Sequence, residues 1–242
     1  MSSPPLPQIK GILFDMDGLL IDSERIYTQV SNQVLAPYGK EMTWEIKAGI
    51  MGRPALDAAT YLVKATGIEL EPQVLLELMD AKVQEAFAKV QPLPGAVKLV
   101  QHLEKHGVPI AASYYPPAST SPFPKNMAIK STHLPDLFNL FGTRIMVGDD
   151  PCLQGKGKPD PTIFIEAAKR HLDFDCDESR SRVLVFEDGV PGVRAARSAG
   201  MPVVWVPDPE LLKTMGDHDL DPTQILNSLL DFVPEEWGLP PY

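Results

Sequence analysis

A short apolar run that ends in two closely spaced aspartates, residues 11–18, constrains this chain more than any other stretch. Residues 12–14 are apolar and β-favouring, and Asp15 and Asp17 follow, so a short buried strand is predicted. Gly18 allows the backbone to turn sharply after it. The carboxyl end of a strand in an open α/β sheet opens into the ligand crevice, which would place both aspartates there. Asp and Gly are also common in turns, so this stretch alone leaves a purely structural role open.

The chain from residue 96 onward alternates helical patterns with short apolar runs. Strands that alternate with helices imply a parallel, doubly wound sheet with right-handed crossovers. The predicted fold class is therefore α/β, with a Rossmann-like core. Further strands are predicted over residues 108–112, 144–147, 183–186 and 202–206, the last of them as the final strand of the sheet.

Residues 22–92 follow a different pattern, in which apolar side chains recur at helical spacing and no strand is predicted. Gly39 and Gly67 stand where glycines commonly end helices, and Pro72 stands where a first-turn proline is common. This stretch is predicted to be a helical unit inserted after the first strand. The expected domains are a core formed by residues 1–21 and 93–242 and an insert formed by residues 22–92.

Composition limits the partners of the chain. A net charge of −10 argues against nucleic acid, because phosphate backbones require a basic patch, but it permits a small phosphorylated ligand held by a few local cations. The N-terminal residues contain no long apolar stretch, so we expect no signal peptide, no membrane segment and a cytoplasmic location. Cys152 and Cys176 match no metal-ligand spacing and are expected to be unpaired thiols. We also expect a monomer.

Polar residues stand at the predicted strand ends, which converge on one crevice in a doubly wound sheet. Taken singly, each has an ordinary explanation: a surface lysine, a turn, a helix cap or a strand-end hydroxyl. Asp149 and Asp150 are a rival acidic pair, which we interpret as a loop or a cap because no cation or hydroxyl accompanies them. The functional interpretation depends on the combination, in order, of Asp15, Asp17, Ser113, Lys158, Glu187 and Asp188.

This combination suits phosphoryl transfer, because a carboxylate such as Asp15 can attack phosphorus and form an aspartyl-phosphate. At ~4 Å, a carboxylate and one phosphate charge repel each other by about 4 kcal/mol at an effective dielectric constant near 20. Mg²⁺ held by Asp15, Asp188 and a backbone carbonyl near Asp17 would offset this repulsion, since hard oxygen ligands suit this ion. Lys158 would add a fixed positive charge.

Two further groups complete this hypothesis. The hydroxyl of Ser113 can donate a hydrogen bond to a phosphoryl oxygen. Asp17 can protonate the leaving alcohol and then activate the water that cleaves the intermediate.

Three segments carry a resemblance to the haloacid dehalogenase-like hydrolase superfamily. Residues 14–18 resemble its first motif, residues 158–161 its third and residues 186–188 its fourth, and the helical insert resembles its substrate-gating cap. The resemblance implies a Mg²⁺-dependent phosphatase that acts on a small sugar or nucleotide monophosphate, with pseudouridine 5′-phosphate among the candidates. It implies that Asp15 is the nucleophile and Asp17 the general acid/base. The implied metal residues are Asp15, Asp17, Glu187 and Asp188, with Lys158 bridging the phosphate and Asp15.

The second motif departs from the superfamily pattern. The strand that should end at Ser113 is followed by Tyr114, Tyr115 and four prolines up to residue 124, which forbid a continuous helix. We expect an irregular loop over residues 114–124, with Ser113 as the remaining hydroxyl. Two alternatives stay open: a sugar-phosphate mutase that uses the same residues, and a binding or regulatory module weakened by this departure.

Overall fold

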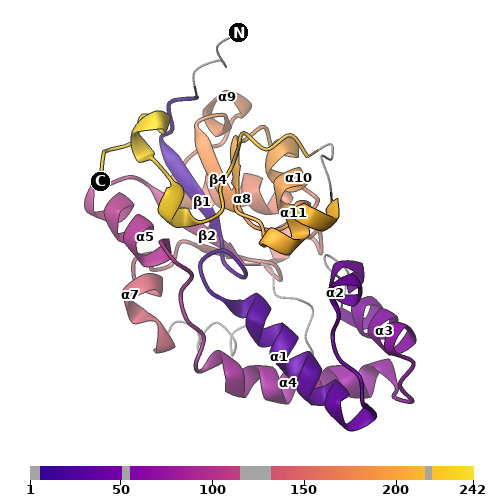
Figure 1. Cartoon of the computed structure of the whole chain (residues 1–242). Helices are drawn as coiled ribbons and strands as arrows, with labels where there is room; N and C mark the ends of the chain where they lie inside the picture. Colours follow the sequence, from indigo (N-terminus) through magenta and orange to yellow (C-terminus); the bar gives the residue numbers. More distant parts are fainter. Residues whose placement is uncertain (1–5, 51–54, 115–131, 216–219) are drawn as a thin grey trace. The chain divides into compact units, whose positions relative to one another are not determined.

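The structure, a computed structural model, describes residues 6–50, 55–114, 132–215 and 220–242 (Figure 1). The chain divides into two compact units. One unit draws on Met1–Ile21, Pro92–Tyr115 and Asp136–Tyr242, and the other draws on Asp22–Gln91 and Pro116–Pro135. Most of the loop predicted over residues 114–124 lies outside the described residues.

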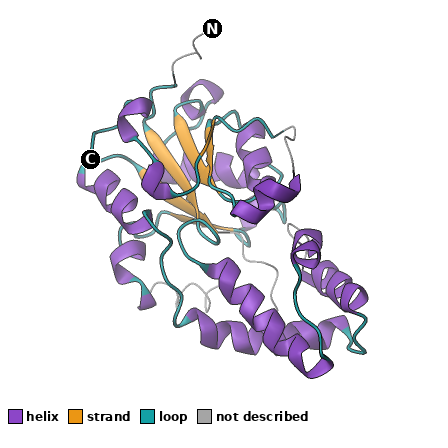
Figure 2. Ribbon diagram, in the orientation of Figure 1, coloured by secondary structure: helices purple, strands orange, loops and turns teal. Residues whose placement is uncertain are grey.

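The first unit is built on a parallel sheet whose strand order is β3-β2-β1-β4-β5-β6. Helices and the C-terminal segment pack around this sheet (Figure 2), which confirms the predicted α/β class. The strands are β1 (Gly11–Asp15), β2 (Ile110–Tyr114), β3 (Ile145–Val147), β4 (Val183–Glu187), β5 (Val203–Trp205) and β6 (Gln224–Ile225). The helices of this unit are α5 (Ala96–Lys105), α7 (Pro135–Phe138), α8 (Thr162–Leu172), α9 (Asp177–Arg180), α10 (Val190–Ser198) and α11 (Pro209–Met215).

Two sequence-based strand limits were wrong. The strand β2 continues through Tyr114, which was expected to begin the loop, because Tyr114 pairs with Val147 of β3. The strand β5 is not the last, since β6 pairs with it through Val204 and Trp205. A two-residue strand has too little pattern to be found before its partner is known.

The centre of the sheet is apolar on both faces, as expected for a parallel sheet covered by helices. All five residues of β1 are buried, and so are all five of β4. Phe14 of β1 stacks on Phe186 of β4 with ring centroids 5.0 Å apart, and Phe232 from the C-terminal segment meets Phe186 edge-on at 4.8 Å. These contacts hold β1 and β4 in the register that carries their carboxyl ends to the same edge.

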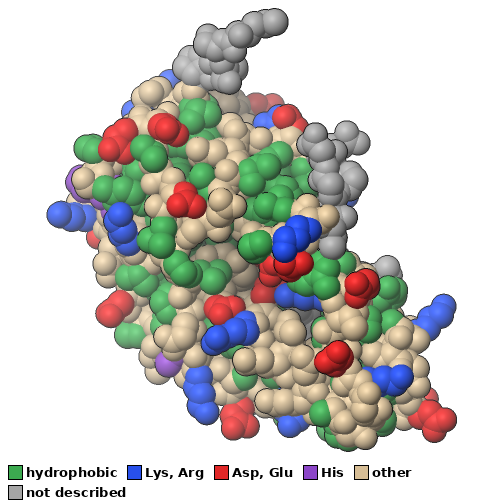
Figure 3. Space-filling model, in the orientation of Figure 1, with side chains coloured by type: hydrophobic (Ala, Val, Ile, Leu, Met, Phe, Trp, Pro, Cys, Tyr) green, Lys and Arg blue, Asp and Glu red, His purple; other side chains and the backbone are tan. Residues whose placement is uncertain are grey.

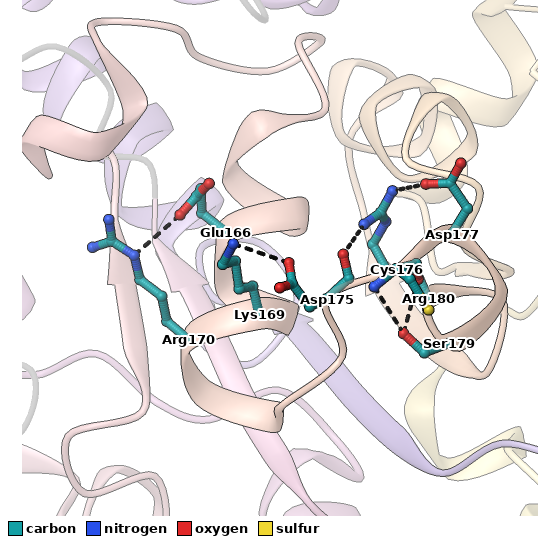
Figure 4. A network of polar contacts seen from close by, with 8 residues as sticks. All are labelled: Glu166, Lys169, Arg170, Asp175, Cys176, Asp177, Ser179 and Arg180. Carbon is teal, nitrogen blue, oxygen red and sulfur yellow. Dashed lines mark hydrogen bonds and ion pairs between the residues drawn. The ribbon is translucent and has the colours of Figure 1, made fainter.

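The connection from α8 to β4 is tied by polar contacts on the surface (Figure 4). Lys169 of α8 pairs with Asp175 at 3.0 Å, and Arg180 of α9 donates to the Asp175 carbonyl at 2.8 Å and pairs with Asp177. Exposed pairs of this kind contribute little each, about 0–1 kcal/mol. They orient a turn and do not form a site.

The second unit is helical where it is described, and no strand occurs in its described part. Its helices are α1 (Ser23–Leu35), α2 (Trp44–Ile50), α3 (Ala55–Thr66) and α4 (Pro72–Phe87). Leu35, Leu62 and Leu75 are buried together in its own apolar cluster. Pro72 begins α4, and Gly39 and Gly67 adopt the left-handed conformation (φ 65° and 67°), as predicted for residues that start and end helices.

Charged side chains are scattered over the face shown in Figure 3, where the described residues form no continuous basic patch. This distribution agrees with the negative net charge. Among the described helices, none combines the length and the apolar character that a membrane crossing requires.

Candidate active site

Asp15 is the last residue of β1, and only 7% of its surface is exposed. It lies opposite Ser113 of β2, one step beyond the pairing of Phe14 with Phe186 of β4. Gly18 adopts φ 81° and donates to the Ile21 carbonyl at 3.0 Å, which closes a tight turn directly after Asp17. The sequence therefore places both aspartates at the carboxyl edge of the sheet, Asp15 buried and Asp17 half-buried.

Lys158 lies between two carboxylates at this edge. Its Nζ atom donates to Asp15 Oδ1 and to Glu187 Oε1. From the sequence, only the order of the motifs indicated that these three residues would meet. Burial opposes the positive charge, but the two carboxylates outweigh burial and raise the pKa of Lys158 above its usual value. Lys158 is thus a permanent cation at the strand ends.

The loop that carries Lys158 is anchored by the start of α8. Asp160 Oδ1 accepts a hydrogen bond at 3.0 Å from the backbone N–H of Thr162, the first residue of α8, which closes a turn before the helix. Lys158 Nζ also lies 5.1 Å from the centroid of the Phe164 ring, within the range of a cation–π contact. The contacts of Asp160 and Phe164 with this loop therefore help to position Lys158.

Glu187 and Asp188 follow one another at the end of β4, and three contacts set their positions. Glu187 Oε2 accepts from the Gly189 backbone N–H at 3.0 Å, while the Trp205 indole N–H donates to the Asp188 carbonyl at 2.8 Å. Gly192 of α10 lies so close that an added Cβ would be 1.8 Å from Glu187 Oε1. The side chain of Glu187 can take its present position only because residue 192 has no side chain.

Asp15, Glu187 and Asp188 each offer a carboxylate oxygen, and these oxygens lie within 4.8 Å of one another. Burial is the largest influence on Asp15 and raises its pKa to about 7, while Lys158 acts in the opposite direction. Carboxylates this close and this buried repel unless a cation joins them. A hard-oxygen set of this kind fits Mg²⁺. The Asp17 side chain is not part of this group, so its predicted place at the metal remains a prediction.

Ser113 is fully buried, and its hydroxyl donates to the Phe14 carbonyl over a long distance of 3.5 Å. The residue after it, Tyr114, completes β2 and is 1% exposed. Burial raises the pKa of the Tyr114 hydroxyl, and the charges of Asp17, Asp15 and Asp149 raise it further. The structure therefore brings a second hydroxyl, which the sequence assigned to a loop, within electrostatic reach of the aspartates.

Of the rival acidic pair, Asp149 and Asp150, the second residue has a structural role. Asp150 Oδ1 accepts from the Cys152 backbone N–H at 2.9 Å at the start of a 3₁₀ turn, Pro151–Leu153, and also contacts Arg170 at 3.4 Å. The interpretation of Asp150 as a cap is confirmed. Cys152 and Cys176 are both free thiols.

Sequence reasoning missed Gly192 and Trp205. Gly192 stands in the first turn of a helix, where a glycine has several ordinary explanations. Trp205 ends an apolar strand, where a core residue is expected. Their role becomes visible only in the structure, where α10 and β5 approach the end of β4. There Gly192 makes room for the Glu187 side chain, and Trp205 holds the Asp188 carbonyl.

Replacing Gly192 by alanine tests this close approach. We expect the Glu187 carboxylate to swing away from Lys158, because the added methyl group would occupy its position. Loss of a buried charge-assisted hydrogen bond corresponds to about 1.5–3 kcal/mol in the free energy of unfolding, measurable by urea denaturation. Gly189→Ala is the matched control, since a Cβ there would meet its neighbours only at 3.7 Å. Equal stability of the two variants would show that Glu187 adjusts without cost.

Known proteins resemble this chain over nearly its whole length. Residues 9–200 match the family described as haloacid dehalogenase-like hydrolase. The (DL)-glycerol-3-phosphatase 2 of Arabidopsis thaliana is 40% identical, over 97% of this chain and 93% of the relative. A probable pseudouridine-5′-phosphatase of Drosophila melanogaster is 36% identical, over 100% of this chain and 99% of the relative.

Solved structures agree with this assignment. The crystal structure of a HAD family hydrolase from Deinococcus radiodurans, which contains bound phosphate and sodium, superposes with a TM-score of 0.75 at 25% identity. It covers 97% of this chain and 99% of that one. The family match, the identity to curated phosphatases and the shared fold lead to one conclusion: this chain belongs to the haloacid dehalogenase-like hydrolase family.

Proposed function

We propose that this protein is a Mg²⁺-dependent phosphatase that hydrolyses a small sugar or nucleotide monophosphate through an aspartyl-phosphate on Asp15. The observation that carries the proposal is the position of Lys158, which contacts Asp15 and Glu187 at the edge where Asp188 completes an acidic group. Names of full-length relatives support a phosphatase acting on a small phosphorylated metabolite.

The residues divide the chemistry between them. An Asp15 carboxylate oxygen attacks phosphorus, the bond from phosphorus to the ester oxygen breaks, and protonated Asp17 gives its proton to the leaving alcohol. Asp17 then takes a proton from the water that attacks the aspartyl-phosphate, so inorganic phosphate leaves and Asp15 is restored. Lys158 holds the carboxylate of Asp15 in place and offers positive charge to the phosphoryl oxygens.

A divalent ion would be held by Asp15, Asp188 and, directly or through a neighbouring ligand, Glu187, with Asp17 in contact through its backbone or side chain. When bound, Mg²⁺ supplies charge neutralisation between the carboxylates and the phosphate. The helical unit, inserted in the chain between β1 and α5, is proposed to act as a substrate-gating cap. We further propose that the core comprises residues 1–21 and 93–242, and that the protein is a cytoplasmic monomer.

A panel of phosphomonoesters tests the proposal by the release of inorganic phosphate. The panel contains pseudouridine 5′-phosphate, glycerol 3-phosphate and FMN, which represent the activities in the names of relatives. We expect turnover of at least one, with pseudouridine 5′-phosphate as the first candidate. Removal of divalent ions by EDTA should reduce the rate by roughly 10³-fold or more, since the ion contributes several kcal/mol. Added Mg²⁺ should restore it.

Two other outcomes would contradict the proposal. Isomerisation of a sugar phosphate without release of phosphate would indicate a mutase, in agreement with the β-phosphoglucomutase of Bacillus subtilis that is 26% identical to this chain. Binding of Mg²⁺ and phosphate without turnover of any ester would indicate a binding or regulatory module.

A further inference from the structure

The peptide group between Asp188 and Gly189 is held at both of its polar atoms. Its carbonyl, which belongs to Asp188, accepts from the indole N–H of Trp205 at 2.8 Å. Its N–H, which belongs to Gly189, donates to Glu187 Oε2 at 3.0 Å. The strand β4 ends at Glu187, so this peptide group lies just beyond the regular strand. Two side chains therefore set its orientation.

Trp205 is well placed to hold this carbonyl. It is the last residue of β5 and pairs with Glu187 of β4, and the next residue, Val206, donates its N–H to the Glu187 carbonyl at 2.7 Å. Only 5% of the surface of Trp205 is exposed. An indole N–H can only donate, and a buried donor needs an acceptor. The pairing of the strands and the burial of the ring thus keep the donor in one place.

Glu187 extends these contacts to the other charged groups of the site. Its Oε1 atom accepts from Lys158 Nζ, which also donates to Asp15. A continuous series of hydrogen bonds therefore runs from Trp205 through the peptide group, Glu187 and Lys158 to Asp15. Asp188, whose carbonyl is part of this series, supplies the third carboxylate oxygen of the acidic group that fits Mg²⁺.

We propose that Trp205 is a positioning residue for the divalent ion and acts through the backbone of Asp188. The inference rests on the proposed function, because it concerns the ion of the same site. A peptide group is planar, so holding the one after Asp188 fixes the ψ angle of that residue and helps to fix where its side chain starts. The loss of a contact that orients a metal ligand typically lowers metal affinity by about 10–100-fold.

Removal of the indole N–H tests the inference. Trp205→Phe lacks this donor and keeps an aromatic ring, and Trp205→Leu takes its place if the phenylalanine variant does not fold. Trp237→Phe is the matched control, because Trp237 is also buried and its indole N–H donates at 3.3 Å to Gln224, a residue outside the acidic group.

The dissociation constant of Mg²⁺ is measured by calorimetry on protein that EDTA has freed of divalent ions. Urea unfolding is then followed with and without Mg²⁺. The increase in the free energy of unfolding that Mg²⁺ causes is a second measure of binding, and it does not depend on the intrinsic stability of each variant.

We expect Trp205→Phe to raise the dissociation constant of Mg²⁺ by about 10–100-fold. Trp237→Phe should leave it unchanged, although both variants lose stability. A purely structural role would lower the stability of Trp205→Phe and leave its dissociation constant at the wild-type value, which would overturn the inference. Equal weakening of Mg²⁺ binding in both variants would also overturn it.

The measurement separates this inference from the proposed function. A wild-type protein that binds no Mg²⁺ would overturn the metal site and the role of Trp205 together. A selective loss of Mg²⁺ affinity in Trp205→Phe would support the role of Trp205 even if the wild-type protein hydrolyses no ester, because binding is measured without turnover.

Discussion

Asp15→Asn is expected to abolish phosphate release while the protein remains folded. The amide is nearly isosteric with the carboxylate, but it is a poor nucleophile and a weak ligand for Mg²⁺. Loss of a covalent nucleophile typically lowers kcat by roughly 10⁴–10⁶-fold. The contact of Lys158 with residue 15 is also weakened, because a neutral acceptor replaces an ionised one. The rate is measured as release of inorganic phosphate under saturating substrate.

The control for this variant removes a carboxylate elsewhere on the same unit. Asp173→Asn suits the purpose, since Asp173 is exposed, ends α8 and adopts φ 63°, a conformation that asparagine also tolerates. It should retain the wild-type rate. Phosphate release by Asp15→Asn at a near wild-type rate would eliminate the aspartyl-phosphate mechanism, whatever the control shows.

Asp17→Asn is expected to lose the acid/base step and to keep the nucleophile. The expected loss is roughly 10²–10⁴-fold in kcat, the usual contribution of a positioned general acid or base. The loss should depend on the leaving group, because an alkoxide needs a proton and p-nitrophenolate needs little help. The measurement compares p-nitrophenyl phosphate with an alkyl phosphate such as glycerol 3-phosphate.

An aspartate that follows another strand provides the comparison for Asp17. Asp149 is exposed after β3, and Asp149→Asn should leave the leaving-group dependence unchanged. If Asp17→Asn slows good and poor leaving groups by the same factor, the acid/base role is wrong, and Asp17 is then a structural residue or belongs to the metal site.

Local sequence pattern accounts for much of this protein. The apolar run before Asp15 and the one before Glu187 specify buried strands, because continuous burial on both faces requires apolar side chains at every position. Helical spacing in residues 22–92 predicts helices, which the structure has there, and apolar side chains of these helices pack together in one cluster. Motif order also indicated the family, which the comparisons confirmed.

Pairing and side-chain approach decided the rest, and these depend on residues distant in sequence. The pairing of Tyr114 with Val147 decides where β2 ends, and the pairing of β6 with β5 decides that a sixth strand exists. Gly192 becomes a requirement only because α10 brings it against Glu187. Contacts between separate elements leave no trace in the local pattern of either partner. The sequence by itself therefore determined the α/β class, the central buried strands and the acidic residues that follow them, whereas the tertiary structure decided where β2 ends, that β6 exists and which neighbours position Glu187 and Asp188.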